Sequence, residues 1–264
     1  MANLEHLALL RAGAVTWIEW RKKNPQISPD LSAANLQGDN LKGALLHSVN
    51  LSKVDLDNAL LVQANLSGAD LNGANLKGAN LIEANLSGAN FSVANLSGAT
   101  LTQADLSHAN LIGADLSEVN LKGAILADAN LIGTDLRGAN LRDADLGTAK
   151  LTRANLCYAD LIAANLIAAD LNKANLYEAE MMGAYLYKTD LYKANLSNAH
   201  LSGAYLLRAN LSEADLSFAD LRWTNLAGAN FAGANLRGAN LRGANLKGAN
   251  LSGTNLDQII MPDS

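Results

Sequence analysis

The sequence predicts an all-β solenoid in which very short strands are joined by regular corners. Every fifth residue from Leu31 to Leu256 is Leu, except at Phe91, Met181 and Phe231. The residue two places before each Leu is usually Ala, and Asn or Asp usually lies between them. This spacing continues without insertion or deletion, which is the signature of a repeat architecture.

A period of five excludes one long helix and one long strand. On an α-helix, five residues turn by about 500°, so successive Leu residues form no face. On a strand, side chains alternate, so an odd period sends successive Leu residues to opposite sides. Short strands with corners satisfy the pattern. Ala and Leu then point inward, Asn or Asp points outward, and the next two residues form the corner, where Gly suits a positive φ.

The repeat Ala-(Asn/Asp)-Leu-X-Gly, as in residues 74–78, is similar to that of the pentapeptide-repeat family. The segments around Trp17-Ile18-Glu19-Trp20-Arg21 and Asn24-Pro25 resemble the N-terminal helices of cyanobacterial members. The resemblance implies a right-handed quadrilateral parallel β-helix with a short N-terminal α-helical cap. Residues 31–256 then make about 11 coils of twenty residues.

The predicted organisation has three parts: a capping helix and linker at 1–27, the β-helix at 28–258, and a tail at 259–264. A single helix is expected from residue 4 to about residue 22, with Asn3 as its N-cap and Pro25 after its end. Trp17 and Trp20 are expected to pack on the first coil. The expected apolar stripe of this helix is Leu4, Leu7, Ala14, Val15 and Ile18.

Three features near the ends of the rod leave alternatives open. Asp39 occupies an inward position, either beside a cation of the helix or in a frayed first coil. Leu45 and Leu60 point outward, and we expect the helix rather than a partner to cover them. The apolar segment 259–261 either folds under the last coil or pairs with a second copy, which would give a homodimer through a coil end.

The unbroken frame allows the outward position to be sorted by side, because residues twenty apart should stack. Two adjacent sides keep Asn or Asp almost throughout, with Lys150 as the one departure. The other two sides carry all the remaining departures. These are Leu60, Thr100, Glu180 and His200 on one side, and Leu45, Ile125, Tyr185 and Tyr205 on the next.

All six tyrosines lie between residues 158 and 205, together with several Lys and Arg residues. Tyr185 and Tyr205 should stack one coil apart, as should Glu180 and His200. Exposed Tyr with Arg is the composition of protein-interaction hot spots. The alternative interpretation is that these tyrosines form an ordinary ladder on the solenoid surface, which would give the same sequence pattern. The predicted partner-binding patch is Tyr177, Tyr185, Tyr187, Tyr192, His200, Tyr205 and Arg208.

The sequence offers no pattern of catalytic, metal-binding or cofactor-binding residues. The four His residues show no metal-ligand spacing, Ser residues lack a nucleophile elbow, and Cys157 stands alone. We therefore predict a protein that is not an enzyme and takes no cofactor. The absence of a secretion signal and of a long apolar run predicts a cytoplasmic protein without membrane insertion.

Two functions are compatible with these observations. The first is a rigid protein-interaction scaffold or regulator that binds an unknown partner protein. The alternative is a DNA-mimicking binder or protector of DNA gyrase, which the family resemblance implies, with rows of Asp such as Asp115, Asp135 and Asp215 in the role of phosphates. The net charge of −5 is weak for such a mimic and also argues against direct nucleic-acid binding.

Overall fold

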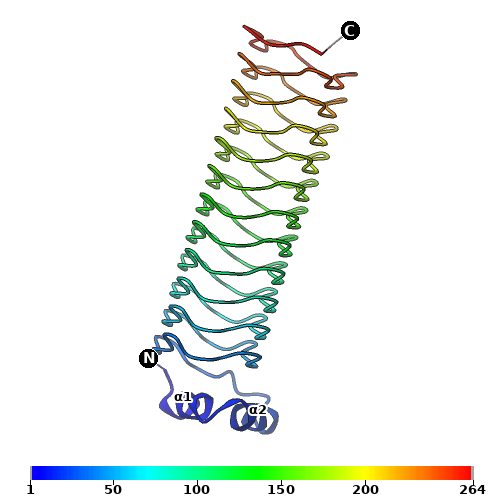
Figure 1. The fold of residues 1–264 in the computed structure, drawn as a ribbon. Helices are drawn as coiled ribbons and strands as arrows, with labels where there is room; N and C mark the ends of the chain where they lie inside the picture. Colours follow the sequence, from blue (N-terminus) through cyan, green and yellow to red (C-terminus); the bar gives the residue numbers. More distant parts are fainter. Residues whose placement is uncertain (1, 263–264) are drawn as a thin grey trace.

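The protein is a straight rod of stacked coils with two short helices at its N-terminal end (Figure 1). The computed structural model describes residues 2–262. Two residues assigned to the tail, Asp263 and Ser264, lie outside the described residues, as does Met1. The two termini lie at opposite ends of the rod, so the coils rather than the termini form its long surface (Figure 1).

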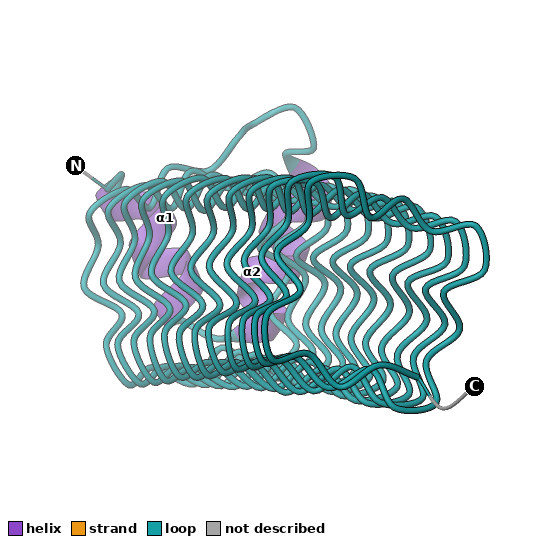
Figure 2. Cartoon of the chain, turned by 90° about the horizontal axis from the view of Figure 1, so that it is seen from above, coloured by secondary structure: helices purple, strands orange, loops and turns teal. Residues whose placement is uncertain are grey.

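Each coil contains twenty residues and has four sides, as predicted. Parallel β-bridges join residues twenty apart from Asp30↔Asn50 to Asn240↔Ile260. Successive coils therefore repeat the same outline when the rod is seen from above (Figure 2). Among the described residues the bridges are isolated rather than parts of longer strands, because two of the five residues on each side form the corner. We name the sides by their outward residues: side A from Asp30 to Asn250, side B from Asn35 to Asn255, side C from Asn40 to Ile260, and side D from Leu45 to Asn245.

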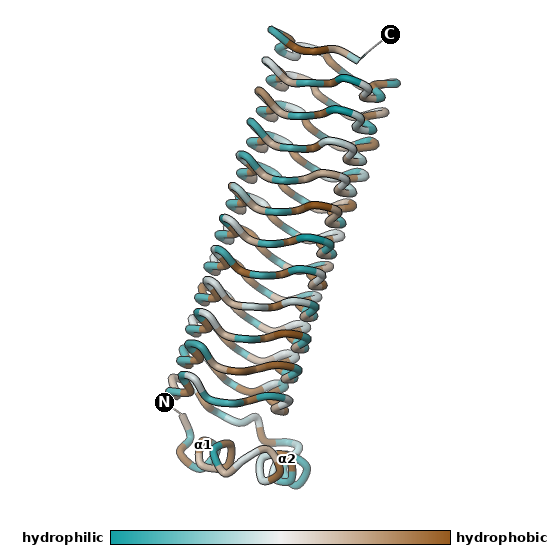
Figure 3. Tube along the Cα trace, viewed as in Figure 1, coloured by the Kyte–Doolittle hydropathy of each residue, from teal (hydrophilic) through white to brown (hydrophobic). Residues whose placement is uncertain are grey.

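The interior is filled by the two inward residues of each repeat. From Leu46 to Leu241 the inward Leu, Phe and Met side chains are at most 1% exposed. Hydrophobic and hydrophilic residues consequently alternate along every coil (Figure 3). Inward Thr residues also find partners, since the Thr134 hydroxyl donates to the Leu111 carbonyl and the Thr189 hydroxyl donates to that of Leu166. The inward Thr hydroxyls in the core are thus hydrogen-bonded.

The outward Asn and Asp side chains form hydrogen bonds with the backbone of the corner and with one another. The Oδ1 atom of Asn75 accepts from the amide of Lys77 at 3.3 Å, which braces the corner. Its Nδ2 group donates to Asp55 Oδ1 at 2.9 Å, one coil below. The same two contacts recur along sides A and B, so these side chains form hydrogen-bonded ladders between coils. The composition of the outward position is therefore set mainly by the fold.

The last residue of each corner has a positive φ, whichever amino acid occupies it. Gly68 has φ +61° and Val93 has φ +51°. Left-handed backbone costs an L-residue about 1–2 kcal/mol. From Ala33 to Gly238 each such amide also bonds to the next coil, for example Val93 N–H to the Ile112 carbonyl at 3.0 Å. The regular stacking therefore holds non-glycine residues in a conformation that they disfavour in isolation.

Replacing Val93 by Gly should raise the free energy of unfolding by about 0.5–1 kcal/mol. The change removes a β-branched residue from left-handed backbone, and this gain exceeds the extra chain entropy of Gly in the unfolded state. Val93 is exposed, so little packing is lost. Urea titrations of the variant and of Gly68→Val, which should lose a comparable amount, test this expectation. A destabilised Val93→Gly protein would contradict it.

The N-terminal segment forms two helices, where the sequence analysis predicted one. Helix α1 spans Leu4–Arg11 and helix α2 spans Ala14–Lys23. The break lies at Gly13, whose φ of +105° is incompatible with a continuous helix. The predicted N-cap is confirmed, because the side chain of Asn3 accepts from the amides at positions 5 and 6. The predicted helix end before Pro25 is also confirmed.

The break at Gly13 changes which helical side chains are buried. The predicted stripe is wrong at Leu4 and Val15, which are 80% and 73% exposed, and at Ala14, which is also exposed. His6, Leu10 and Trp17 are buried instead. Trp17 is fully buried and its indole N–H donates to the Leu45 carbonyl at 2.8 Å, while its ring stacks on Trp20 at 5.7 Å. The two tryptophans therefore anchor the cap to the first coil, as expected.

The outward Leu residues near the cap and the apolar segment near the C-terminus are only partly covered. Leu45 is half-buried against the cap and core, but Leu60 is 44% exposed, so the helices cover only the first of these two residues. At the other end of the rod, Ile259 packs partly on the core. Ile260 and Met261 are exposed. The apolar segment 259–261 thus covers the last coil only at its first residue.

Candidate protein-interaction surface

Side D carries the one stacked tyrosine pair on the outward positions of the described coils. The rings of Tyr185 and Tyr205 lie 5.2 Å apart and are parallel within 4°. Both side chains are about half exposed, at 46% and 49%. The positions below and above are Asn165 and Asn225. The tyrosine stacking predicted from the twenty-residue period is therefore confirmed, and it interrupts an amide ladder with an apolar step.

Apolar corner residues extend this pair sideways. The corner between sides C and D presents Ile162 and, one coil above it, Met182, which is 42% exposed. The corner between sides D and A presents Ile167, Tyr187 and Leu207 at successive coils. Together with the tyrosine pair they form a continuous band, which we call the aromatic strip. Its members are Ile162, Ile167, Met182, Tyr185, Tyr187, Tyr205 and Leu207.

Sequence analysis missed the aliphatic members of the aromatic strip. The sorting by side covered only the outward middle positions, and the corner tyrosines entered the predicted patch without their aliphatic neighbours. The same sorting by twenty would have placed Ile167, Tyr187 and Leu207 in one column. A single apolar corner residue is indistinguishable from an ordinary exposed turn residue. The apolar column becomes visible only when residues twenty apart are compared.

Charged groups border the aromatic strip on both long edges. On side C, His200 Nδ1 lies 2.8 Å from Glu180 Oε1, which confirms the predicted stacking of these two residues. On the opposite edge, Lys188 Nζ lies 5.2 Å from the centre of the Tyr187 ring. Arg208 is exposed on the same corner one coil further along. An apolar centre with a polar rim is the usual anatomy of a protein interface.

Two of the predicted patch residues lie elsewhere on the rod. Tyr177 is on the corner between sides B and C, where its ring meets the edge of Tyr158 at 5.6 Å. Tyr192 is on the corner between sides A and B, diagonally opposite the corner of sides C and D. Its hydroxyl donates to Glu213 Oε1 at 3.0 Å. Two hydrogen bonds raise the pKa of Lys193, and the one to Tyr192 contributes more than the one to Glu213.

The described residues contain no cluster of three or more His, Cys, Asp or Glu that could hold a metal ion. Nor is any helix between residues 2 and 262 long and apolar enough to cross a membrane. Two cavities of about 240 Å³ lie beside the cap, and both are lined in part by Ile18 and Leu45. The aromatic strip is a convex surface band, which suits a macromolecular partner better than a small ligand.

Comparison with known proteins identifies the repeat. The sequence pattern of pentapeptide repeats matches eight times in succession, at residues 30–61, 59–98, 89–126, 114–153, 149–186, 159–198, 189–226 and 224–261. The chain is 38% identical to HetL, a pentapeptide-repeat protein from the cyanobacterium Nostoc sp. strain PCC 7120 that is involved in regulating heterocyst differentiation. That match covers 80% of this chain and 90% of HetL, with a TM-score of 0.41.

Two further solved structures are more distant. The plasmid-mediated fluoroquinolone resistance protein QnrB1 is 20% identical over 83% of this chain and 89% of its own, with a TM-score of 0.37. The pentapeptide-repeat protein Rfr23 from Cyanothece 51142 is 27% identical over 63% of this chain and 66% of its own, with a TM-score of 0.15. No curated protein matches the chain significantly.

Proposed function

Since the chain belongs to the pentapeptide-repeat family, we propose that it is a non-enzymatic scaffold or regulator that binds a partner protein on the aromatic strip. The observation that carries this proposal is the exposed, stacked pair of Tyr185 and Tyr205, which is flanked along its column by Asn165 and Asn225. HetL is involved in regulating heterocyst differentiation, and from it we take only the general idea of a regulatory role. The right-handed sense of the coil and a cytoplasmic location stay predictions.

The rigidity of the aromatic strip favours its use as a partner-binding surface. Tyr side chains present large contact area with few rotatable bonds, and here the two rings are further restrained by stacking. The coil below each ring is held by backbone bonds of about 2.9 Å, such as Tyr205 N–H to the Ala184 carbonyl. A partner would therefore meet a preorganised surface and lose little entropy on ordering it.

Replacing both tyrosines by Asn should weaken partner binding by tenfold or more, since hot-spot residues contribute about 2 kcal/mol or more each. Asn restores the residue that the repeat normally places there, so the variant Tyr185→Asn/Tyr205→Asn should fold normally. Tyr192→Asn, on the opposite corner, is the matched control and should bind like the wild type. Affinity capture followed by titration of the purified partner measures both. Equal binding by the double variant would refute the proposal.

The gyrase-directed DNA mimic receives less support from the geometry. On sides A and B the Asp carboxylates are half-buried and engaged in ladders, for example Asp70 with Asn90 at 2.8 Å and Asp215 with Asn235 at 2.9 Å. Arg137 binds Asp135 at 2.6 Å and lowers the pKa of that carboxyl. These carboxylates are partly buried and already hydrogen-bonded, and the Arg137 guanidinium offsets the charge of Asp135. Inhibition of DNA supercoiling at micromolar protein would reverse this ranking.

We also propose that a second copy binds at the C-terminal end of the rod. The amides of Leu246, Leu251 and Leu256 find no backbone acceptor within residues 2–262, whereas the equivalent amides of earlier coils pair with the next coil. Leu256 and Met261 are exposed beside them. An edge with free donors and an apolar centre favours pairing. Sedimentation equilibrium should show a dimer, and a monomer at all concentrations would contradict this.

A further inference from the structure

The first coil has an edge whose backbone groups need partners other than a preceding coil. In the interior, each outward residue donates its amide to the coil before it and accepts an amide there. Asn75, for example, donates to the Val54 carbonyl and accepts from the Leu56 amide. The cap must supply the equivalent contacts for the first coil, because residues 2–29 do not form a coil themselves.

The cap supplies contacts on three of the four sides. On side A, Asp30 donates its amide to His6 Nδ1 at 3.0 Å, and its carbonyl accepts from the Asn3 amide at 2.9 Å. On side B, Arg11 Nη2 donates to the Asn35 carbonyl at 3.0 Å. On side D, Trp17 Nε1 donates to the Leu45 carbonyl at 2.8 Å. Arg11 and Trp17 thus replace the amide donors of a preceding coil, and His6 Nδ1 replaces a carbonyl acceptor.

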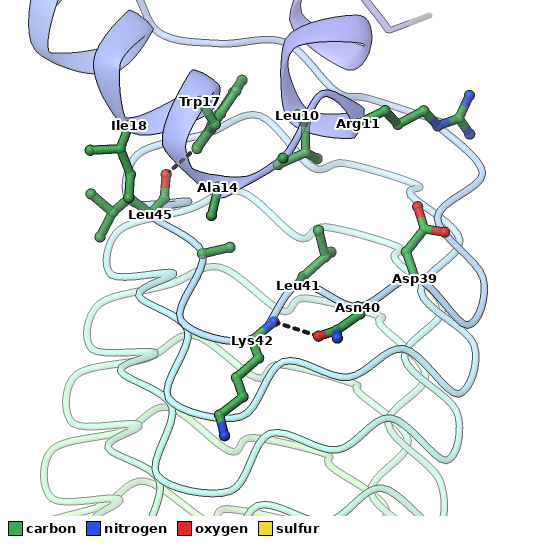
Figure 4. Close-up of a pocket in the computed structure, with 12 residues that line it drawn as sticks. Leu10, Arg11, Ala14, Trp17, Ile18, Asp39, Asn40, Leu41, Lys42 and Leu45 are labelled. Atoms are coloured by element: carbon green, nitrogen blue, oxygen red, sulfur yellow. Dashed lines mark hydrogen bonds between the residues drawn. The ribbon is translucent and has the colours of Figure 1, made fainter.

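Side C is left open. Neither the amide nor the carbonyl of Asn40 has a hydrogen-bond partner among residues 2–262, and Asn40 is exposed. One of the two cavities of about 240 Å³ opens at this point, between the junction of the two helices and the coil (Figure 4). Its apolar wall includes Leu10, Trp17 and Leu41. A free donor, a free acceptor and an apolar recess therefore occur together.

Asp39 gives this opening a charge. It occupies an inward position that Ala59 and Ala79 fill in the next two coils. Its carboxylate makes no ion pair within the described part of the chain. Figure 4 shows the carboxylate directed toward the cap, while the Lys42 ammonium points along the rod, away from the cavity. Arg11, the other nearby cation, is bonded to the Asn35 carbonyl.

We propose that an extended peptide segment of a partner protein adds to side C of the first coil as a parallel strand. In the register of the rod, the peptide residue facing Asn40 would be preceded by a carbonyl that accepts the Asn40 amide. It would be followed by an amide that donates to the Asn40 carbonyl. Main-chain bonds of this kind give affinity in strand addition, and the alternate side chains give specificity.

The same register predicts the side chains of the peptide. Residues flanking the central one point inward, as they do in every coil. The first lies over Asp39 and should be Lys or Arg. The third lies over Leu41 and should be apolar, because Leu10 and Leu41 line the cavity there. The recognised pattern is therefore a basic residue, any residue, then an apolar residue. The site lies near the cap and is independent of the aromatic strip.

The probe is the peptide acetyl-Gly-Lys-Ser-Leu-Gly-amide, titrated into the full-length protein while the amide exchange of Asn40 is followed by NMR. We expect slower exchange and a chemical-shift change at Asn40 at millimolar peptide. The peptide with N-methylated Leu lacks the donor to the Asn40 carbonyl and should bind several-fold more weakly. Free lysine amide and leucine amide, added separately, should leave Asn40 unprotected; protection by either would favour a small-molecule site and overturn the proposal.

Asp39→Ala restores the usual residue of the repeat and should weaken binding of the Lys peptide by about two- to fivefold, the size expected of an exposed ion pair. The control Asp143→Ala removes an exposed carboxylate from a corner several coils away and should change nothing. An unchanged indole Nε1–H resonance of Trp17 in the NMR spectrum would show that the cap is intact in both. Equal binding by the two variants, or by the N-methylated peptide and its parent, would overturn the proposal.

Discussion

Replacing Leu146 by Ala should lower the free energy of unfolding by about 2–5 kcal/mol. Leu146 is fully buried in the middle of the rod, with Leu126 and Leu166 at the same position in the coils below and above. All four sides around it are tied by backbone bonds, such as Leu146 N–H to the Asn165 carbonyl at 2.7 Å. The wall has little freedom to collapse, so the change leaves a cavity.

Urea titration followed by circular dichroism measures this loss, with Leu60→Ala as the control. Leu60 points outward and is 44% exposed, so its truncation should cost less than about 1 kcal/mol. Repeat proteins need not unfold in two states, so the two variants should also be compared by hydrogen exchange of their neighbouring coils. An equal cost at both positions would contradict the filled core.

Deleting five residues and deleting twenty should have opposite effects on binding. Removal of residues 191–195 keeps every inward Leu stacked and every member of the aromatic strip, but it rotates all later coils by one side. Tyr205 would then lie above Glu180, and Tyr185 would face Asn210. Because the aromatic strip is divided between two sides, partner binding should fall by tenfold or more.

Removal of residues 121–140 instead deletes one complete coil and leaves every later residue on its own side. This protein should fold and bind its partner like the wild type. Circular dichroism checks the fold of both deletions, and titration with the partner measures the difference between them. Wild-type binding by the five-residue deletion would show that the register of the strip is irrelevant, and a misfolded twenty-residue deletion would contradict the four-sided coil.

The repeat itself made most of the fold predictable. A Leu every five residues is incompatible with a single helix or strand, and the family resemblance supplied the square section that the parallel bridges confirm. The stacking of Tyr185 on Tyr205 followed directly from this register. The side of the coil on which a residue lies follows from its residue number, because the five-residue repeat contains no insertion or deletion.

The features that could not be predicted depend on hydrogen bonds and packing contacts that the five-residue period does not specify. The helix break at Gly13 and the burial of His6 arise because the cap must bond to the edge of the first coil. The pairing of Asn75 with Asp55 shows that outward amides form ladders between coils, and the sequence pattern predicted only that these side chains point outward. Tyr192 joined the predicted patch because it is close in sequence, although its corner faces another direction.

The central claim is that a partner protein contacts the aromatic strip, and photocrosslinking tests it most directly. A benzophenone side chain is introduced in place of Tyr187, within the aromatic strip, or in place of Tyr192, which is equally half-buried on a distant corner. We predict that irradiation joins the partner to the protein modified at Tyr187 and leaves the other unlinked. Equal crosslinking from both positions, or crosslinking from Tyr192 alone, would contradict the account.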